Sequence, residues 1–257
     1  MDIIKRDAGV FYMSIYAISD LHLSIAVNKK MDVFDKVWEN YHTKIKENWE
    51  KNIKAEDFVL IPGDISWGMN FKEALKDFEF INKLPGNKLI SKGNHDYWWD
   101  TKSKFEKFCK ENEFGTIKMI HNNCEKADDF IVCATRGWPP EKDGGEIDDK
   151  EQILYNRKIY DRELGRLKRS LEAAEAAQSK EHGEKKIIVA MHYPPFDYKQ
   201  KSSDFVELML KYSVKLCVYG HLHSDGINKA VQGNFKGINF KLVSADSMDF
   251  TPYKLPV

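Results

Sequence analysis

Short apolar runs lead directly into clusters of polar residues at five places along the chain. The runs span residues 15–19, 58–62, 88–91, 186–191 and 215–219, and each has the length and composition of a buried β-strand. The polar clusters that follow them are Asp20, Gly63-Asp64, Lys92 to Asp96, His192 and Gly220 to His223. The pattern therefore predicts five strands whose carboxyl ends carry polar side chains.

Helical periodicity fills segments between these runs. Residues 71–84 and 101–112 read as helices, and residues 31–51 place six apolar side chains on one face, namely Phe34, Val37, Trp38, Tyr41, Ile45 and Trp49. Alternation of strands with helices predicts an α/β fold. Ligand sites in open α/β sheets lie outside the carboxyl ends of the strands, so we expect the five polar clusters to converge in one crevice.

Two further regions read as antiparallel strand pairs and predict a second sheet. They are residues 116–136 and 229–244, each with apolar runs on both sides of a polar or turn-prone stretch. Residues 141–185 are highly charged and predict a long helical insertion with a solvated face. We expect one domain over residues 13–257, with residues 1–12 as an N-terminal extension and Met13 as a candidate translation start.

Composition narrows the class of protein. The chain has 257 residues, 42% of them hydrophobic, and 40 basic side chains balance 40 acidic ones, so the bulk charge does not favour a nucleic-acid or membrane partner. The N-terminus lacks the pattern of a signal peptide, and no stretch approaches the roughly 20 apolar residues of a membrane span. The cysteines, at positions 109, 124, 133 and 217, show no metal-binding spacing. We expect a cytoplasmic protein with reduced, mostly buried thiols.

Histidines concentrate in the polar clusters. Of eight in the chain, five lie there: His22, His95, His192, His221 and His223. A single histidine at a strand end is more often a hydrogen-bonded structural residue than a ligand, but five together favour a metal site. Imidazole nitrogen mixed with carboxylate oxygen, without thiolate, suits Mn, Fe, Zn or Co rather than calcium or a structural cysteine-bound zinc.

The five blocks, in this order, resemble the signature of the calcineurin-like metallophosphoesterase superfamily, as in predicted phosphohydrolases of bacterial type. The blocks are Asp20-x-His22, Gly63-Asp64, Gly93-Asn94-His95-Asp96, His192 and Gly220-His221-x-His223, so the resemblance covers residues 15–223. It implies an α/β fold of two packed mixed β-sheets flanked by helices, an α/β/β/α sandwich. It also implies a dinuclear metal site.

The resemblance assigns seven residues as metal ligands. One metal is expected on Asp20, His22, Asp64 and His223, and the other on Asp64, Asn94, His192 and His221, with Asp64 bridging. Two divalent cations bring four positive charges, of which the two aspartates cancel two. The site therefore stays about two units positive, which favours a phosphate group.

Three further residues have expected roles next to the metals. The resemblance makes His95 a catalytic residue that faces the substrate, and Asp96 its partner, accepting a hydrogen bond that fixes the ring. Alternatively, Asp96 caps a turn before the helix at 101–112. Arg136 ends an apolar strand, and its guanidinium suits a phosphate clamp, although a surface ion pair is nearly as plausible.

Aromatic residues follow several of the blocks. They are Trp67, Tyr97, Trp98, Trp99, Trp138 and Tyr193. Such rings can stack on a nucleobase or line an apolar pocket, but packing in the core or at its rim is the commoner role.

The function that these features predict is hydrolysis of a phosphate monoester or diester by a hydroxide that bridges two divalent metals. We expect a small-molecule or nucleotide substrate. A nuclease is an alternative, because residues 166–169 and 199–201 are rich in basic side chains, although the zero net charge counts against it. A non-catalytic scaffold is disfavoured because every ligand is present, and a protein phosphatase stays possible. Fold and metal site do not name the substrate.

Overall fold

Two β-sheets form the centre of the computed structural model, which describes residues 13–140, 150–179, 185–197 and 199–256. The strands are β1 (Ile15–Ala17), β2 (Phe58–Pro62), β3 (Asn87–Ser91), β4 (Ile117–Met119), β5 (Cys124–Ala127), β6 (Phe130–Thr135), β7 (Lys186–Met191), β8 (Leu216–Tyr219), β9 (Gly233–Phe235), β10 (Ile238–Leu242) and β11 (Tyr253–Lys254). The helices are α1 (Tyr41–Asn52), α2 (Phe71–Lys83), α3 (Lys102–Glu111), α4 (Lys150–Gln178) and α5 (Asp204–Lys211). Three short 3₁₀ helices join them: η1 (Lys36–Trp38), η2 (Ser224–Lys229) and η3 (Ala245–Met248).

Both sheets are mixed. The first has the order β11-β1-β2-β3-β4, in which β1 to β4 are parallel and β11 pairs antiparallel with β1. The second has the order β5-β6-β7-β8-β10-β9, with a parallel centre and an antiparallel strand at each edge. The predicted fold of two mixed sheets flanked by helices is confirmed.

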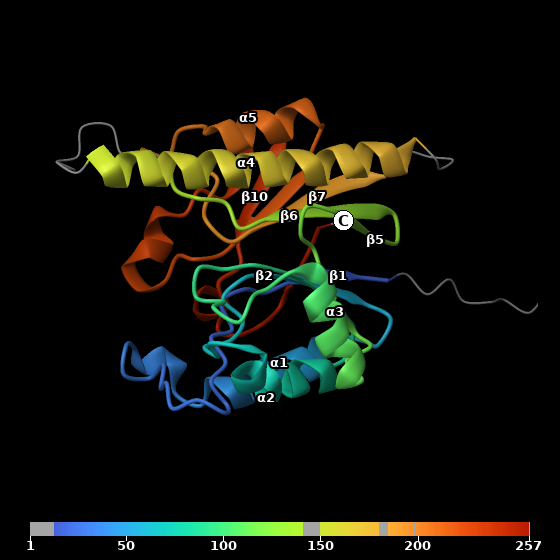
Figure 1. The fold of residues 1–257 in the computed structure, drawn as a ribbon, viewed down its shortest axis with the longest axis vertical. Helices are drawn as coiled ribbons and strands as arrows, with labels where there is room; N and C mark the ends of the chain where they lie inside the picture. The colour runs from blue at the N-terminus through green and yellow to red at the C-terminus, as the bar shows by residue number, and fades with distance from the viewer. Residues whose placement is uncertain (1–12, 141–149, 180–184, 198, 257) are drawn as a thin grey trace, which may run out of the picture.

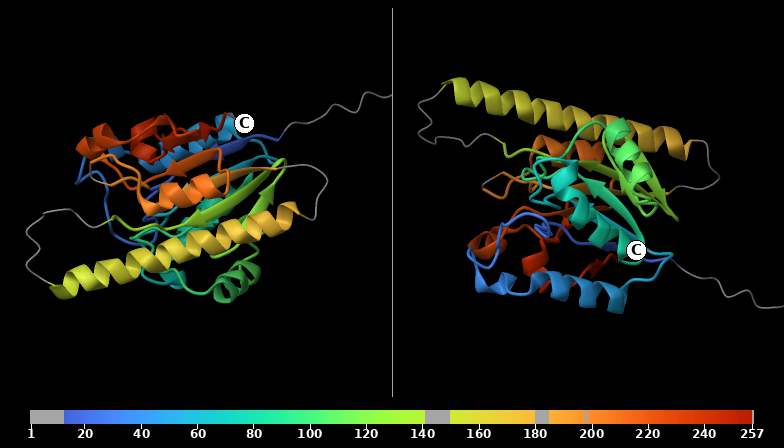
Figure 2. Two further views of the ribbon diagram at one scale, coloured as in Figure 1. Left: turned by 90° about the horizontal axis from the view of Figure 1, so that it is seen from above. Right: turned by 60° about the horizontal axis from the view of Figure 1, so that its bottom comes forward.

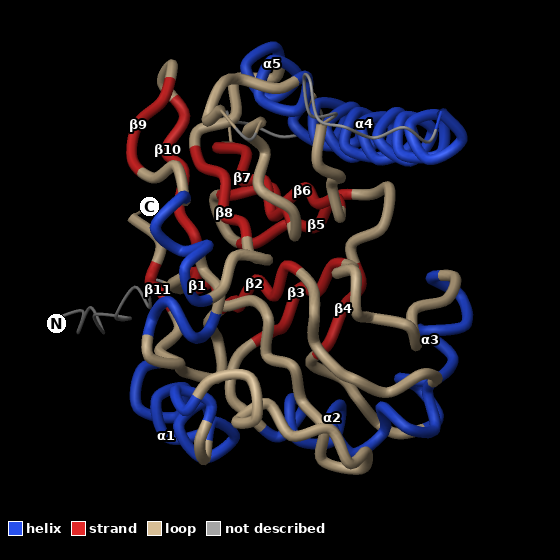
Figure 3. Tube along the Cα trace, turned by 90° about the vertical axis from the view of Figure 1, so that its left-hand side faces the viewer, coloured by secondary structure: helices blue, strands red, loops and turns tan. Residues whose placement is uncertain are grey.

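The alternation of apolar side chains between the two faces of each strand explains why the two sheets stack. Ile15 and Ala17 of β1 point into a core shared with Ile188 and Ala190 of β7, whereas Tyr16 packs on the opposite face of its sheet. Because successive strand residues point to opposite faces, each apolar strand contributes to two cores. The result is a four-layer arrangement, with both sheets in the middle and helices outside (Figures 1 and 3).

Helices cover the outer face of each sheet. The helices α1 and α2 lie under the first sheet with α3 beside them, and α4 and α5 run side by side over the second (Figures 1 and 2). Side chains cap the starts of three of the α-helices: Asn70 accepts from the Glu73 amide at α2, Thr101 from the Lys104 amide at α3, and Ser203 from the Phe205 amide at α5. The predictions for residues 71–84 and 101–112 are confirmed within one residue at each end.

The helix predicted over residues 31–51 is wrong in about its first half. A long helix begins only at Tyr41, because Asn40 adopts a left-handed conformation with φ of 55° and Asp35 instead caps the 3₁₀ helix η1. Phe34, predicted on the buried face, is 68% exposed.

The antiparallel pairing predicted within residues 116–136 is also wrong in part. The strand β4 extends the first sheet in parallel beside β3, and the partner of β6 is the short strand β5. β5 lies inside the stretch that the sequence analysis took as a polar connection. The pairing predicted within residues 229–244 is confirmed as β9 and β10.

The charged segment contains the long helix α4, as predicted, but one face of that helix is not solvated. Leu167, Leu171 and Ala174 are buried against the second sheet, at the spacing of a helix face. Residues 141–149 and 180–184 lie outside the described residues, as do residues 1–12, the predicted N-terminal extension. Met13 is the first described residue, and a translation start there stays a prediction. All four cysteines are unpaired, and no helix among the described residues is long and apolar enough to cross a membrane.

Candidate metal centre

The predicted ligands come together at the carboxyl ends of strands from both sheets. Asp20, Asp64 and Asn94 follow β1, β2 and β3 of the first sheet, while His192 and His221 follow β7 and β8 of the second. Backbone hydrogen bonds join neighbouring ligand loops: the Asp20 amide donates to the Gly63 carbonyl, and the Gly220 amide donates to that of His192. The predicted convergence of these side chains is therefore found, but they come from strand ends of two sheets rather than one.

One group of candidate ligand atoms surrounds Asp20. Its carboxylate and the rings of His22 and His223 offer atoms that all lie within 4.8 Å of one another. The Asp20 Oδ1 is 3.4 Å from His223 Nε2, and His22 Nε2 is 3.8 Å from Asp64 Oδ2. These atoms are near enough to share a metal, because ligands 2.0–2.2 Å from one ion lie roughly 3–4 Å apart.

A second group surrounds His192. Its Nε2 lies 2.6 Å from Asn94 Oδ1, 3.3 Å from His221 Nδ1 and 3.6 Å from Asp64 Oδ2. The Oδ2 atom of Asp64 therefore lies close to a histidine of each group. A carboxylate that bridges two metals has to lie between the ligands of both, as this oxygen does.

The tautomer of His192 fits a metal ligand. Its Nδ1 is 3.2 Å from the carbonyl oxygen of Pro62, which can only accept, so Nδ1 carries the proton. Burial lowers the pKa of His192 to about 3, which keeps the ring neutral. The unprotonated Nε2 then faces the Asn94 oxygen. Two lone pairs at this distance repel one another unless a cation lies between them, as it does when both atoms are ligands of one metal.

The electrostatic environment of the carboxylates also fits a metal site. Asp20 Oδ1 is buried without a hydrogen-bond partner in the described structure, while Oδ2 accepts from the Ser19 hydroxyl and the His221 amide. Burial, together with the nearby Asp20 and Asp96, raises the pKa of Asp64. Burial lowers the pKa of His221 to about 4. Crowded carboxylates next to neutral imidazoles form a donor set that fits divalent cations.

Three glycines allow the ligand loops to approach this closely. A Cβ on Gly93 would overlap Asp64 Oδ1, and one on Gly220 would overlap Asp20 Oδ2. Gly63 has φ of +89°, and a Cβ there would meet the Gly93 backbone at 2.6 Å. Each position therefore requires glycine for space, and Gly63 also for its conformation.

The backbone of several predicted ligands is strained. Asp20, His22, Asp64 and His221 have φ between 44° and 73°, the left-handed region that residues other than glycine seldom adopt. Such conformations persist only where surrounding structure enforces them, and they concentrate at functional sites.

Asp246 is a site residue that the sequence analysis missed. Its Oδ1 lies 2.8 Å from His223 Nδ1, so His223 donates there and turns Nε2 toward Asp20. Burial lowers the pKa of His223, but the carboxylates of Asp20 and Asp246 outweigh it and raise that pKa to about 10. A cation at this position displaces the Nε2 proton, as metal ligation does. The sequence feature that could have indicated Asp246 is an acidic residue just after the apolar run at residues 238–243.

The predicted pairing of Asp96 with the His95 ring is not found. Within the described residues, the fully buried Asp96 carboxylate accepts from the amides of Asp64, Ile65 and Gly93 and from the Trp98 indole. The alternative role is found in part, because the Asp96 carboxylate accepts from the Gly93 amide of the turn that precedes α3, whereas Thr101 caps the helix itself. Asp96 also holds two ligand loops together.

His95 lies beside the centre, and no described residue makes a hydrogen bond to its ring. Its amide donates to Asp64 Oδ1 at 2.8 Å, and its ring lies 4.5 Å from that of Trp67. Nδ1 is buried and has no hydrogen-bond partner in the described structure. Burial, and then the charge of Lys29, lowers the pKa of His95.

Arg136 is found in a buried ion pair. Its guanidinium is 3.4 Å from Glu163 of α4, and the two side chains are 12% and 0% exposed, so the surface pair considered from sequence is not what forms. The same carboxylate oxygen lies 2.6 Å from Arg166. Arg136 also lies over the Trp138 ring, 4.8 Å from its centroid.

The aromatic residues divide between the two roles considered from sequence. Trp98 packs on Phe78 in the core, and Trp67 stacks on His22 with ring centroids 5.0 Å apart. Tyr193, by contrast, lies 4.2 Å from the His221 ring and lines a pocket there.

The close approach at Gly93 yields a testable prediction. Gly93→Ala places a methyl group on the Asp64 carboxylate, so we expect Mn²⁺ affinity, measured by calorimetry, to fall about 100-fold. Gly115→Ala is the matched control, because no atom lies within 4 Å of its added Cβ. Equal Mn²⁺ affinity in the two variants would contradict the assigned geometry.

The contact of Asp246 with His223 yields a second testable prediction. Asp246→Asn keeps the shape of the side chain but removes the charge that fixes the ring. We expect Mn²⁺ affinity to fall roughly 10- to 100-fold with little change in melting temperature. Unchanged affinity would show that Asp246 does not orient a ligand.

Comparison with known proteins identifies the family. A family model described as calcineurin-like phosphoesterase matches residues 13–225. The chain is similar to the crystal structure of AQ665 from Aquifex aeolicus, described as a protein of unknown function, at 17% identity and a TM-score of 0.47, over 95% of this chain and 96% of that one. It is also similar to the crystal structure of TT1561 of Thermus thermophilus, at 12% identity and a TM-score of 0.49, over 95% and 98%. No curated protein matches the sequence. The family match shows that the chain belongs to the calcineurin-like phosphoesterases, which are metal-dependent hydrolases of phosphoric esters.

Proposed function

We propose that this protein hydrolyses a small-molecule phosphate ester at a dinuclear metal centre. The observation that carries the proposal is the position of Asp64, whose Oδ2 lies 3.8 Å from His22 Nε2 and 3.6 Å from His192 Nε2. Asp20, His22 and His223 would hold one metal and Asn94, His192 and His221 the other, with Asp64 shared. The nitrogen and oxygen donors suit Mn, Fe or Zn.

The chemistry of such a centre follows from its charge. When bound, two divalent metals supply Lewis-acid stabilisation of the phosphoryl oxygens and a water of lowered pKa. The two carboxylates, Asp20 and Asp64, leave an excess of about two positive charges, which attracts a phosphate group.

His95 is the proposed catalytic residue outside the ligand set. Its ring nitrogen Nδ1 has no partner among the described residues, and its amide is fixed by Asp64. A ring N–H at this place can donate to the oxygen of the leaving group. Asp96 is the proposed positioning residue, because its carboxylate fixes the loops that carry Asp64 and Gly93.

Arg136 is the proposed phosphate clamp. Its neighbour Glu163 also lies within ion-pair distance of Arg162 and Arg166, so one buried carboxylate faces three guanidinium groups. Arg136 Nε is buried and has no hydrogen-bond partner in the described structure. The excess positive charge favours an anionic substrate group near Tyr193, whose amide donates to the Arg136 carbonyl.

A small substrate is favoured over nucleic acid. The basic side chains of residues 166–169 are engaged within the protein: Arg166 pairs with Glu163, Lys168 with Glu172, and Arg169 donates to Asn122. A nuclease needs a continuous basic track for the phosphate backbone.

The bridging role of Asp64 can be tested directly. Asp64→Asn removes the shared negative charge, so we expect hydrolysis of chromogenic phosphate mono- and diesters in Mn²⁺ to fall at least about 1,000-fold. Asp161→Asn on the exposed face of α4 is the control and should retain wild-type rates. Substantial metal-dependent turnover by Asp64→Asn would refute the scheme.

The clamp has its own test. Arg136→Ala should raise both KM and the inhibition constant of inorganic phosphate about tenfold, because a charge-assisted contact with phosphate is lost. Glu163 keeps its contact with Arg166, so the fold should survive. Arg157→Ala, which removes a guanidinium from an exposed pair on α4, is the control. If Arg136→Ala behaves like that control, Arg136 is structural only.

A further inference from the structure

A pocket of about 580 Å³ opens directly beside the metal centre, at the ring of His221. Four segments form it: the prolines that follow β6, the connection between β7 and α5, residues 219–222 at the end of β8, and residues 229–231 at the end of η2. Its size lies within the roughly 300–1,000 Å³ range of small-molecule pockets.

The walls of this pocket are apolar and partly aromatic. Tyr193, Phe196 and Tyr219 contribute rings that are themselves almost fully buried, and Leu222 and Val231 contribute aliphatic surface. The prolines at 139, 140 and 194 add rigid apolar surface. Such walls favour a ring system rather than a charged or strongly hydrated group.

Polar groups in the pocket are largely engaged by the protein. The Tyr219 hydroxyl donates to the Val231 carbonyl at 2.6 Å, and Gln200 donates to the Lys229 carbonyl. Asp197 Oδ1 accepts from two backbone amides of its own turn, at 2.9 and 2.7 Å. The charges of Asp197 and Lys229 offset one another, so the pocket does not select an ion.

The pocket is continuous with the predicted ligands. The ring of Tyr193 lies 4.2 Å from that of His221 and 5.2 Å from that of His192, while Tyr193 and His221 both line the pocket. An ester with its phosphoryl group at the metals can therefore extend its organic part into this space.

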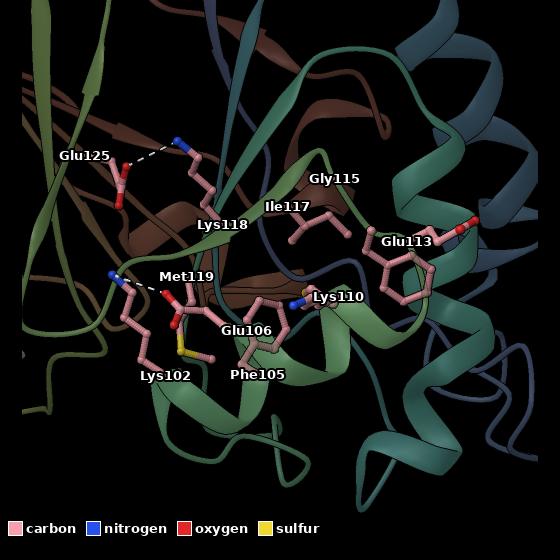
Figure 4. Close-up of a pocket in the computed structure, with 12 residues that line it drawn as sticks. Lys102, Phe105, Glu106, Lys110, Glu113, Gly115, Ile117, Lys118, Met119 and Glu125 are labelled. Carbon is pink, nitrogen blue, oxygen red and sulfur yellow. Dashed lines mark ion pairs between the residues drawn. The ribbon is translucent and has the colours of Figure 1, made fainter.

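A second hollow, of about 450 Å³, lacks this connection. It lies between α3 and β4, with Phe105 and Ile117 in its wall (Figure 4). Ion pairs of Lys102 with Glu106 and of Lys118 with Glu125 lie at its rim. None of its lining residues is a predicted ligand, so we assign it no role in substrate binding.

We propose that the pocket beside His221 binds the leaving group of the substrate, and that this group is an uncharged, largely apolar ring system. The inference rests on the proposed phosphoesterase function. In the reaction, water adds to phosphorus, the bond from phosphorus to the ester oxygen breaks, and that oxygen takes a proton. The products are a ring-bearing alcohol, released from the pocket, and a phosphate.

The test uses two phosphonates that share an anionic group and differ in the ring. We expect 1-naphthylmethylphosphonate to bind the Mn²⁺-loaded protein at least about tenfold more tightly than methylphosphonate, as measured by calorimetry. Ala230→Trp, which fills the pocket, should reduce this advantage to about twofold or less. Ala176→Trp on the exposed part of α4 is the matched control and should keep the full advantage.

The outcomes separate the two claims. Equal binding of the two phosphonates to the wild-type protein would overturn the inference, as would an undiminished advantage in a folded Ala230→Trp variant. Should that variant not fold, the wild-type comparison decides alone. Turnover of 2-naphthyl phosphate is measured separately: its absence together with selective phosphonate binding counts against the proposed function, while the preference of the pocket for an apolar ring still holds.

Discussion

The carboxylate of Asp64 lies where the two sheets meet, and the arrangement of the whole centre depends on where it points. Its Oδ1 accepts from the His95 amide, while its Oδ2 faces His22 on one side and His192 on the other. Its amide is held in turn by the buried carboxylate of Asp96. Burying three carboxylates close together, these two and Asp20, is costly without compensating charge. In the proposed centre, divalent cations supply that charge, so the carboxylates whose burial is costly are also the groups that would select the metals.

The fold provides the rigidity that this crowding requires. Strands of both sheets end at the centre, and the core between the sheets, with Ala17 and Ala190 among its members, fixes their separation. Four predicted ligands hold left-handed backbone conformations, and Gly93 and Gly220 admit carboxylates where any side chain would collide. Strain of this kind is stable only on a well-packed scaffold. The pocket at His221 uses the same scaffold, because Tyr193 follows a predicted ligand and Tyr219 precedes another.

Sequence patterns carried most of the fold and the positions of the predicted ligands, because both arise from local signals. Apolar runs that end in Asp, Asn or His mark strand ends, and the family resemblance rests on those same residues. The sequence pattern failed where contacts between residues far apart in the chain determine the structure. Asn40 breaks an apolar periodicity that otherwise continues through Phe34, and β4 pairs with β3 rather than with the next apolar run. Asp246 and the Asp64 amide that donates to Asp96 were missed because a side-chain partner more than 20 residues away leaves no periodic trace.

The central claim is that two metals share Asp64, and crystals soaked in Mn²⁺ test it most directly. The account predicts two anomalous peaks roughly 3.5–4 Å apart with the Asp64 carboxylate between them. One peak should be flanked by Asp20, His22 and His223, and the other by Asn94, His192 and His221. A single peak, or two peaks of which neither touches Asp64, would contradict the account.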